Sequence, residues 1–176
     1  MNRIKLVGIN FDHMHMGDLL RLALKHPQVD VVGVSDEQPD RVRPVLDRLG
    51  IAQDKFVADY RKLLEQAKPD IAILCPATGD HAVWTERVAA FGCHVMVEKP
   101  FAGSVADADR MIAALAKTGK QLAINWPLRW YPSHATAKRL TLTKAQKGKR
   151  ITVKVTGKQT GYRTVSRTSA KTAKVT

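Results

Sequence analysis

Short apolar segments alternate with amphipathic segments through the first 125 residues of the chain. The apolar segments carry hydrophobic side chains at consecutive positions, which is typical of parallel strands that are buried on both faces. They predict strands at residues 4–9, 29–34, 71–75, 94–97 and 121–124, with a very short additional strand at residues 56–57.

The segments between these strands carry apolar residues at helical spacing, and residues typical of helix starts and stops frame them. The segments predict helices at residues 18–26, 40–49, 82–91 and 104–116, and one more that carries Leu63 and Leu64. The framing residues are Asp59 and Ser104 at the starts, and Pro27, Gly50, Gly92 and Gly119 at the ends.

This alternation predicts an α/β fold, a Rossmann-like, doubly wound parallel sheet with helices on both faces. Ligands of such a sheet bind outside the carboxyl ends of the strands, where the winding reverses. The chemistry of the chain is therefore expected in the residues that directly follow each strand.

The turn after the first strand predicts part of a dinucleotide site. Such turns usually read Gly-x-Gly-x-x-Gly, which lets the backbone approach a pyrophosphate and lets the helix pack against the strand. Here Gly8 fits, but Asn10 and His13 occupy the second and third glycine positions, with Phe11 between them. Asn tolerates a positive φ better than most residues, whereas His13 requires a shift in the packing. An ordinary strand-to-helix turn is the alternative for this loop alone.

The second strand ends at Asp36, which slightly favours NAD. A carboxylate here can accept hydrogen bonds from both ribose hydroxyls of NAD and repels the additional phosphate of NADP. Arg41 and Arg43 follow closely and leave NADP open as the cofactor. A solvated cap is the other interpretation of Asp36.

The net charge of +13 is concentrated at the end of the chain. Residues 141–176 contain 10 of the 29 Lys and Arg and none of the 16 Asp and Glu, so the first 140 residues carry a net charge of only +3. Composition therefore divides the chain near residue 140. A basic tail also predicts, as an alternative function, salt-dependent binding of nucleic acid or another polyanion. Nucleic acid is not favoured, because the tail has no base-reading motif and its aromatic content is Tyr162 alone.

Composition indicates a cytoplasmic protein without a membrane span. No apolar run reaches the roughly 18 residues that a membrane helix needs, and the first residues lack the apolar stretch of a secretory signal. Cys75 and Cys93 form no Cys-x-x-Cys pair, and a reducing compartment is expected.

Residues 98–100, Glu-Lys-Pro, resemble the signature of the glucose–fructose oxidoreductase, inositol dehydrogenase and rhizopine catabolism family (Gfo/Idh/MocA). Residues 32–36, 68–73, 91–95 and 125–132 agree with the family in order and spacing. The resemblance covers about residues 3–140. It implies an NAD(P)-dependent oxidoreductase that transfers a hydride to or from a sugar, a cyclitol or a related polyol.

The resemblance gives Lys99 and Glu98 catalytic roles beside the cofactor. The matching lysine lies next to the nicotinamide ring and the substrate hydroxyl, where a fixed cation stabilises the charge that develops on oxygen. Glu98 would orient or tune Lys99, and Pro100 would stiffen the turn and favour an unusual peptide geometry. A surface salt pair before a proline is the alternative interpretation.

The same resemblance implies further cofactor contacts. The loop at residues 76–81 matches the family's loop near the pyrophosphate and the nicotinamide ribose, which assigns Pro76, Thr78 and His81 to the cofactor site. The family usually places its histidine one residue closer to the proline, so a helix-start histidine without a ligand is equally in keeping with the sequence. Arg129 would contact cofactor or substrate, or brace the domain interface.

No metal site is expected from the polar residues of the first turn. Asp12, His13, His15 and Asp18 lack the His-x-x-x-His spacing of a helical zinc pair, and no Cys-x-x-Cys supports them. A turn lined with polar side chains is the expected structure.

The resemblance divides the chain into an NAD(P)-binding Rossmann domain, residues 1–125, and the truncated beginning of an α+β domain for substrate and oligomer contacts, residues 126–176. A helix at residues 133–140 and a strand at residues 148–157 match that second domain. A strand at residues 162–166 and a disordered basic tail are the alternatives beyond it.

Family members are much longer and usually take an Asp and a His for proton transfer from the second domain. Here the last histidine is His134 and the last acidic residue is Asp109. The chain is therefore expected to be a truncated or frame-shifted relative that binds dinucleotide and turns over poorly alone. A non-enzymatic dinucleotide-binding protein is a further alternative, and homo-oligomerisation is left open.

Overall fold

The computed structural model describes residues 3–127, 147–150, 152, 154–157, 165–168, 170–171 and 173–174. The chain divides into two compact units, Met1–Pro127 and Leu128–Thr176. The first unit contains a parallel sheet with its helices, and the described part of the second unit contains an antiparallel pair of strands.

Five parallel strands form the sheet of the first unit. The chain forms β1 first, adds β2 on one side of it and then continues on the other side, in the order β2-β1-β3-β4-β5. The winding therefore reverses between β1 and β3, which is where a doubly wound sheet binds its ligands. The strands are β1 (Ile4–Ile9), β2 (Val29–Ser35), β3 (Ile71–Leu74), β4 (His94–Glu98) and β5 (Leu122–Asn125).

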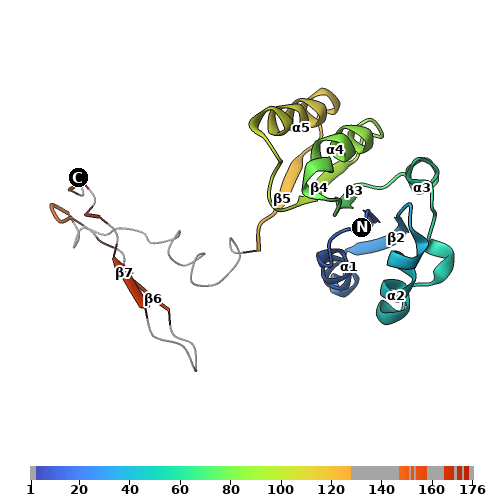
Figure 1. Ribbon diagram of the computed structural model, residues 1–176, viewed down its shortest axis with the longest axis horizontal. Helices are drawn as coiled ribbons and strands as arrows, with labels where there is room; N and C mark the ends of the chain where they lie inside the picture. The colour runs from blue at the N-terminus through green and yellow to red at the C-terminus, as the bar shows by residue number, and fades with distance from the viewer. Residues whose placement is uncertain are drawn as a thin grey trace. The chain divides into compact units, whose positions relative to one another are not determined.

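Helices cover both faces of this sheet, with α1 and α2 on one side and α4 and α5 on the other (Figure 1). Neighbouring residues of β1 show the two layers, because Leu6 belongs to the core beneath α1 and α2 whereas Val7 belongs to the core beneath α3, α4 and α5. The α-helices are α1 (His15–Lys25), α2 (Pro39–Leu49), α3 (Tyr60–Ala67), α4 (His81–Ala89) and α5 (Val105–Thr118). The short 3-10 helices are η1 (Gln53–Lys55) and η2 (Thr78–Asp80).

Two predicted helix caps and two predicted helix stops are confirmed. The Asp59 carboxylate accepts a hydrogen bond from the amide of Arg61 at the start of α3, and the Ser104 hydroxyl accepts one from the amide of Asp107 at the start of α5. Gly50 and Gly119 end α2 and α5 in the left-handed region. The predicted α/β class with a doubly wound parallel sheet is likewise confirmed.

Some element boundaries differ from the prediction for local reasons. α1 begins at His15 rather than at residue 18, because the amide of His15 donates to the His13 ring and Met16 donates to the His13 carbonyl. The strand predicted at residues 56–57 is wrong, since Phe56 directly follows η1 and forms only an isolated bridge with Val34.

The described part of the second unit forms one antiparallel pair, β6 (Lys154–Gly157) with β7 (Val165–Thr168). β6 lies within the strand predicted at residues 148–157, and β7 overlaps the end of the one predicted at residues 162–166. The helix predicted at residues 133–140 lies outside the described residues.

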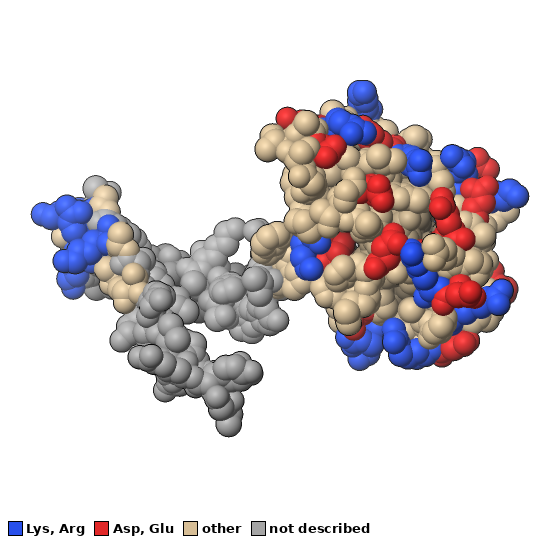
Figure 2. Space-filling model, viewed as in Figure 1, with Lys and Arg blue, Asp and Glu red and all other residues tan. Residues whose placement is uncertain are grey.

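The visible surface of the first unit carries basic and acidic side chains interspersed with one another (Figure 2). This mixture agrees with the small net charge of the first 140 residues. In the part of the chain that the structure describes, no helix is long and apolar enough to cross a membrane.

Candidate functional site

Backbone hydrogen bonds connect the turn after β1 to the carboxyl ends of β2 and β3. The amide of Asn10 donates to the carbonyl of Ser35 at 3.0 Å, and the amide of His13 donates to the carbonyl of Cys75 at 3.2 Å. The predicted site residues Gly8, Asn10, His13 and Pro76 are therefore brought together at the switch point of the sheet.

Asn10 adopts the left-handed conformation that a glycine usually supplies at this place. Its φ is 67°, which confirms that asparagine can replace the second glycine of the turn. The side chain is buried, and Asn10 Oδ1 has no hydrogen-bond partner among the described residues. Gly8 allows α1 to pack closely, since a Cβ there would lie 2.9 Å from Met16 Sδ and would force that side chain to shift.

The carboxylate of Asp36 is buried and accepts two backbone amides. Oδ2 accepts from Phe11 at 2.6 Å, and Oδ1 accepts from Gln38 at 2.7 Å. Asp36 therefore fixes the turn after β1 against the turn after β2. It also borders a polar cleft of about 210 Å³ that is lined by Asn10, Asp12, Asp36, Glu37, Gln38, Arg41, Asp80 and Trp84.

Arg41 forms an ion pair with Asp12 on the turn after β1. Both side chains are partly exposed at the mouth of the same cleft. Arg43 is exposed, and its carbonyl accepts a long hydrogen bond from Gln53. A phosphate on the adenosine ribose would therefore have to compete with Asp12 for Arg41.

Glu98, at the end of β4, is 1% exposed and lies among three polar groups. Asn125 Nδ2 donates to Oε2 at 2.8 Å, while His15 Nδ1 lies 3.1 Å and Lys99 Nζ 3.9 Å from Oε1. Burial alone would raise the pKa of Glu98, but Asn125, His15 and the Lys99 backbone outweigh burial and lower it. Glu98 is therefore ionised at neutral pH and holds Lys99 beside the carboxyl edge of the sheet.

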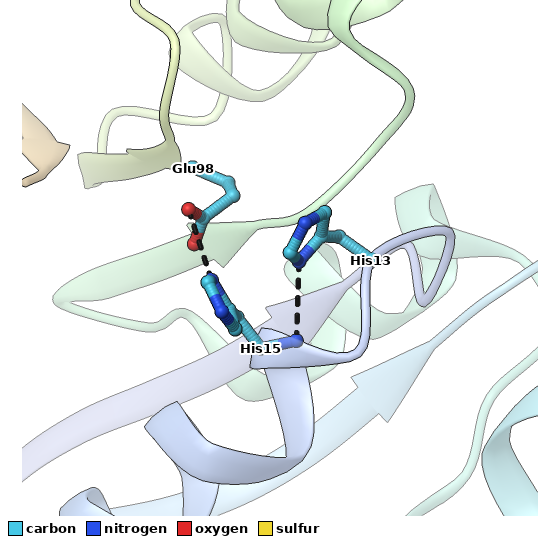
Figure 3. Close-up of side chains that lie close together, drawn as sticks. All are labelled: His13, His15 and Glu98. Carbon is cyan, nitrogen blue, oxygen red and sulfur yellow. Dashed lines mark hydrogen bonds and ion pairs between the residues drawn. The ribbon is translucent and has the colours of Figure 1, made fainter. Parts of the chain in front are cut away.

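The His15 ring points toward Glu98 from the start of α1, and His13 lies beside His15 on the preceding turn (Figure 3). Their rings are 4.3 Å apart in a T-shaped arrangement, and His13 Nδ1 accepts the amide of His15 at 3.2 Å. Burial, followed by the positive charges of His15, Lys99 and His81, lowers the pKa of His13 against the opposing effect of Glu98. His13 is therefore neutral near pH 7.

The loop after β4 contacts the start of α4. The Lys99-Pro100 peptide bond is cis, as the expectation of an unusual geometry at Pro100 suggested. His81 is buried, and its Nδ1 lies 3.3 Å from the carbonyl of Phe101. Thr78 is exposed on η2, and Arg129 lies outside the described residues.

The sequence did not predict two neighbours of Glu98 as site residues. They are His15 and Asn125. Asn125 lies opposite Glu98 in the register of β4 and β5, so the pairing of two adjacent strand ends was the signal that could have found it. His15 is the first residue of α1, which begins earlier than expected, and its Nδ1 lies 3.1 Å from Glu98 Oε1.

A doubly wound sheet with a left-handed turn at its switch point and polar groups at its strand ends defines a nucleotide-binding domain of the Rossmann class. Residues 3–126 match the family model described as the Gfo/Idh/MocA oxidoreductase family, NAD-binding Rossmann fold. The chain belongs to this family.

A curated relative is similar in sequence, and solved structures share the fold. The myo-inositol 2-dehydrogenase of Thermotoga maritima is 33% identical over 84 residues, which cover 48% of this chain and 25% of the relative. GenD2 from gentamicin A biosynthesis, solved with NAD, superimposes with a TM-score of 0.73 at 21% identity, covering 85% of this chain and 42% of GenD2. KijD10, a 3-ketoreductase of Actinomadura kijaniata solved with NADP, gives a TM-score of 0.68 at 25% identity. The superposition covers 77% of this chain and 42% of KijD10.

The chain spans only a part of the proteins that it resembles. The matched regions cover between 25% and 36% of the length of the curated relatives.

Proposed function

We propose that the first unit binds NAD or NADP across the carboxyl ends of its strands, as the cofactor domain of an oxidoreductase. The observation that carries this proposal is the turn after β1, where left-handed Asn10 lies in hydrogen-bond contact with the ends of β2 and β3. The adjoining polar cleft and the unpaired Asn10 Oδ1 fit a ligand rich in hydroxyls and phosphates.

The pyrophosphate would lie over the turn from Gly8 to His13 and the start of α1. The amino end of α1 carries the positive end of the helix dipole, which attracts phosphate oxygens, although the amides of His15 and Met16 already donate to His13. The adenosine ribose would lie in the cleft beside Asp36, whose carboxylate oxygens each keep a further lone pair for a hydroxyl. Phe11, Pro76 and Thr78 would border the same cofactor.

Lys99 would act on the substrate oxygen while the nicotinamide accepts or donates the hydride. A hydride that leaves a carbinol carbon produces developing charge on oxygen, which the Lys99 ammonium stabilises or relays as a proton. Glu98 would hold this lysine in position through their ion pair, in which Lys99 Nζ lies 3.9 Å from Glu98 Oε1. Lys99 is 38% exposed, so a substrate can reach it.

A sugar, a cyclitol or a related polyol is the proposed substrate class. The relatives include a myo-inositol 2-dehydrogenase and a dTDP-3,4-didehydro-2,6-dideoxy-alpha-D-glucose 3-reductase. We assign residues 126–176 to the beginning of the substrate domain and propose the first 125 residues as the cofactor domain.

Titration of the purified chain with NADH and with NADPH, followed by cofactor fluorescence, tests the proposal. Saturable binding is expected for at least one cofactor, and Lys99→Met should leave the dissociation constant within a few-fold because Lys99 acts on the substrate. Lys68→Met is a matched control, since Lys68 lies at the end of α3, before the amino end of β3. The absence of saturable binding for both cofactors would contradict the proposal.

A further inference from the structure

Three metal-ligating side chains converge at the start of α1 although they come from distant parts of the sequence. His13 and His15 belong to the turn after β1 and to α1, whereas Glu98 belongs to the end of β4. One ligand atom from each side chain can be chosen so that all three lie within 4.8 Å of one another (Figure 3).

Two of these atoms are buried without a hydrogen-bond partner. His15 Nδ1 and Glu98 Oε1 lie 3.1 Å apart, at ion-pair distance, but neither atom has a hydrogen-bond partner among the described residues. Glu98 is 1% exposed, so water does not readily satisfy its oxygen. A buried polar atom without a partner is costly, and a cation between the two atoms would remove that cost.

The 3.1 Å separation fits two ligands of one metal ion. With metal–nitrogen and metal–oxygen bonds of about 2.0–2.1 Å, it corresponds to an angle at the metal of about 100°. That angle lies between the octahedral and the tetrahedral values. His13 is partly exposed on the turn, and its ligand atom lies within 4.8 Å of the other two, so His13 would complete the set by a rotation of its side chain.

We propose that His13, His15 and Glu98 bind a divalent transition-metal ion. Two imidazoles and one carboxylate suit Zn²⁺, Co²⁺ or Fe²⁺, whereas Mg²⁺ and Ca²⁺ prefer oxygen ligands throughout. Three protein ligands leave at least one coordination position for water or a bound molecule.

The surroundings of Glu98 support this assignment. Ligating carboxylates are usually held by a hydrogen bond through their second oxygen, and Asn125 Nδ2 donates to Glu98 Oε2 at 2.8 Å. His13 Nδ1 accepts a hydrogen bond of 3.2 Å from the amide of His15. This bond would break when the His13 ring rotates toward the metal ion or changes its tautomer. Lys99, 3.9 Å from Glu98 Oε1, competes with the metal ion for the carboxylate.

The competition between Lys99 and the metal ion for Glu98 predicts a change in metal affinity that a cluster without a metal ion would not show. Lys99→Met removes a positive charge beside the site, so the variant should bind the metal ion several-fold more tightly than the unaltered chain. Asn125→Leu leaves every ligand in place and should weaken binding by about 10–100-fold, the loss typical of a second-shell partner.

Titration of the chelator-treated chain with Co²⁺, followed by visible absorption and by displacement with Zn²⁺, tests the inference directly. His15→Ala, Glu98→Gln and His13→Ala should each weaken binding by at least as much as Asn125→Leu. His26→Ala is the control, because His26 is an exposed histidine at the far end of α1. Circular dichroism shows whether each variant is folded, and His13→Ala changes only a partly exposed side chain.

Equal Co²⁺ affinities of the unaltered chain and of folded His13→Ala and His15→Ala, or no binding at all, would overturn the inference. The titration is made without dinucleotide, so it does not depend on the proposed function. A chain that binds NADH but not Co²⁺ contradicts the metal site alone, and one that binds Co²⁺ but neither dinucleotide contradicts the cofactor proposal alone.

Discussion

The Asp36 carboxylate, at the end of β2, accepts a hydrogen bond of 2.6 Å from the amide of Phe11 in the turn after β1. A residue expected from the sequence to bind ribose therefore also fixes the turn that is proposed to hold the pyrophosphate. Both parts of the proposed site depend on one buried side chain.

Asp36→Ala should therefore lower stability as well as cofactor affinity. The substitution removes the carboxylate that accepts hydrogen bonds from the amides of Phe11 and Gln38. Loss of these bonds predicts a decrease of about 1–3 kcal/mol in the free energy of unfolding. Urea unfolding measures this loss, and cofactor fluorescence measures the affinity. Glu37→Ala changes the exposed neighbour and serves as the control. Identical unfolding midpoints for the two variants would contradict the bracing role of Asp36.

The ion pair between Asp12 and Arg41 predicts a change in cofactor preference. Asp12→Ala frees Arg41 at the mouth of the cleft, where the guanidinium can pair with the additional phosphate of NADPH. An exposed ion pair is worth up to about 1 kcal/mol, so the ratio of NADPH to NADH affinity should rise by up to about fivefold.

The control for this change is Asp18→Ala, which breaks the comparable exposed pair with Arg21 on α1. The ratio of the two dissociation constants is the informative quantity, because it cancels any general loss of binding. A ratio that Asp12→Ala leaves unchanged, or moves toward NADH, would show that Arg41 does not reach the phosphate.

Much of the fold could be predicted from the sequence because it depends on local patterns. Apolar runs indicate buried parallel strands, and Asp59 and Ser104 cap the helices that they precede. The prediction of a strand at residues 56–57 was wrong. The only backbone bridge of Phe56 among the described residues is with Val34, which is distant in sequence, so no local pattern specifies it.

The site was predicted less completely because its contacts join distant residues. Glu98 and Lys99 were found through the family signature, but the contact of Glu98 with His15 depends on how α1 packs against the carboxyl edge of the sheet. Spacing rules for metal ligands consider neighbours along one helix, so they do not include a carboxylate from β4.

Gly33 lies where β2 packs against α3, and we expect it to tolerate replacement by alanine poorly. A Cβ at Gly33 would lie 2.4 Å from Leu63 Cδ1 and 3.3 Å from the carbonyl oxygen of Lys55, and Leu63 is itself buried. Gly33→Ala is expected to lower the free energy of unfolding by about 1–3 kcal/mol, the usual cost of overpacking. Thermal and urea unfolding measure the loss.

Gly79→Ala is the matched control, because a Cβ at Gly79 has no neighbour within 4 Å. It should change stability by less than about 0.5 kcal/mol, as substitutions at open surface positions do. Equal unfolding midpoints for the two alanine variants would mean that α3 moves away from β2 without cost.

Cys75 should make the stability of the first unit fall in alkaline solution. Burial, together with the charges of Glu98 and Asp12, raises the pKa of this thiol from 9.0 to about 12. The unfolded chain therefore releases the thiol proton above pH 9 while the folded chain retains it, so the stabilising contribution is complete below pH 9 and is lost as the pH rises toward 12. The loss should be on the order of 1 kcal/mol per pH unit in that window.

Cys75→Ala isolates this effect from other alkaline titrations, since it removes the thiol and leaves the remaining groups unchanged. The difference in unfolding free energy between the unaltered chain and the variant should be constant from pH 7 to pH 8.5. Above pH 9 the difference should move against the unaltered chain, because the unaltered chain alone then loses the contribution of the thiol. Profiles that stay parallel up to pH 10.5 would mean that the folded chain ionises Cys75 as readily as the unfolded chain does.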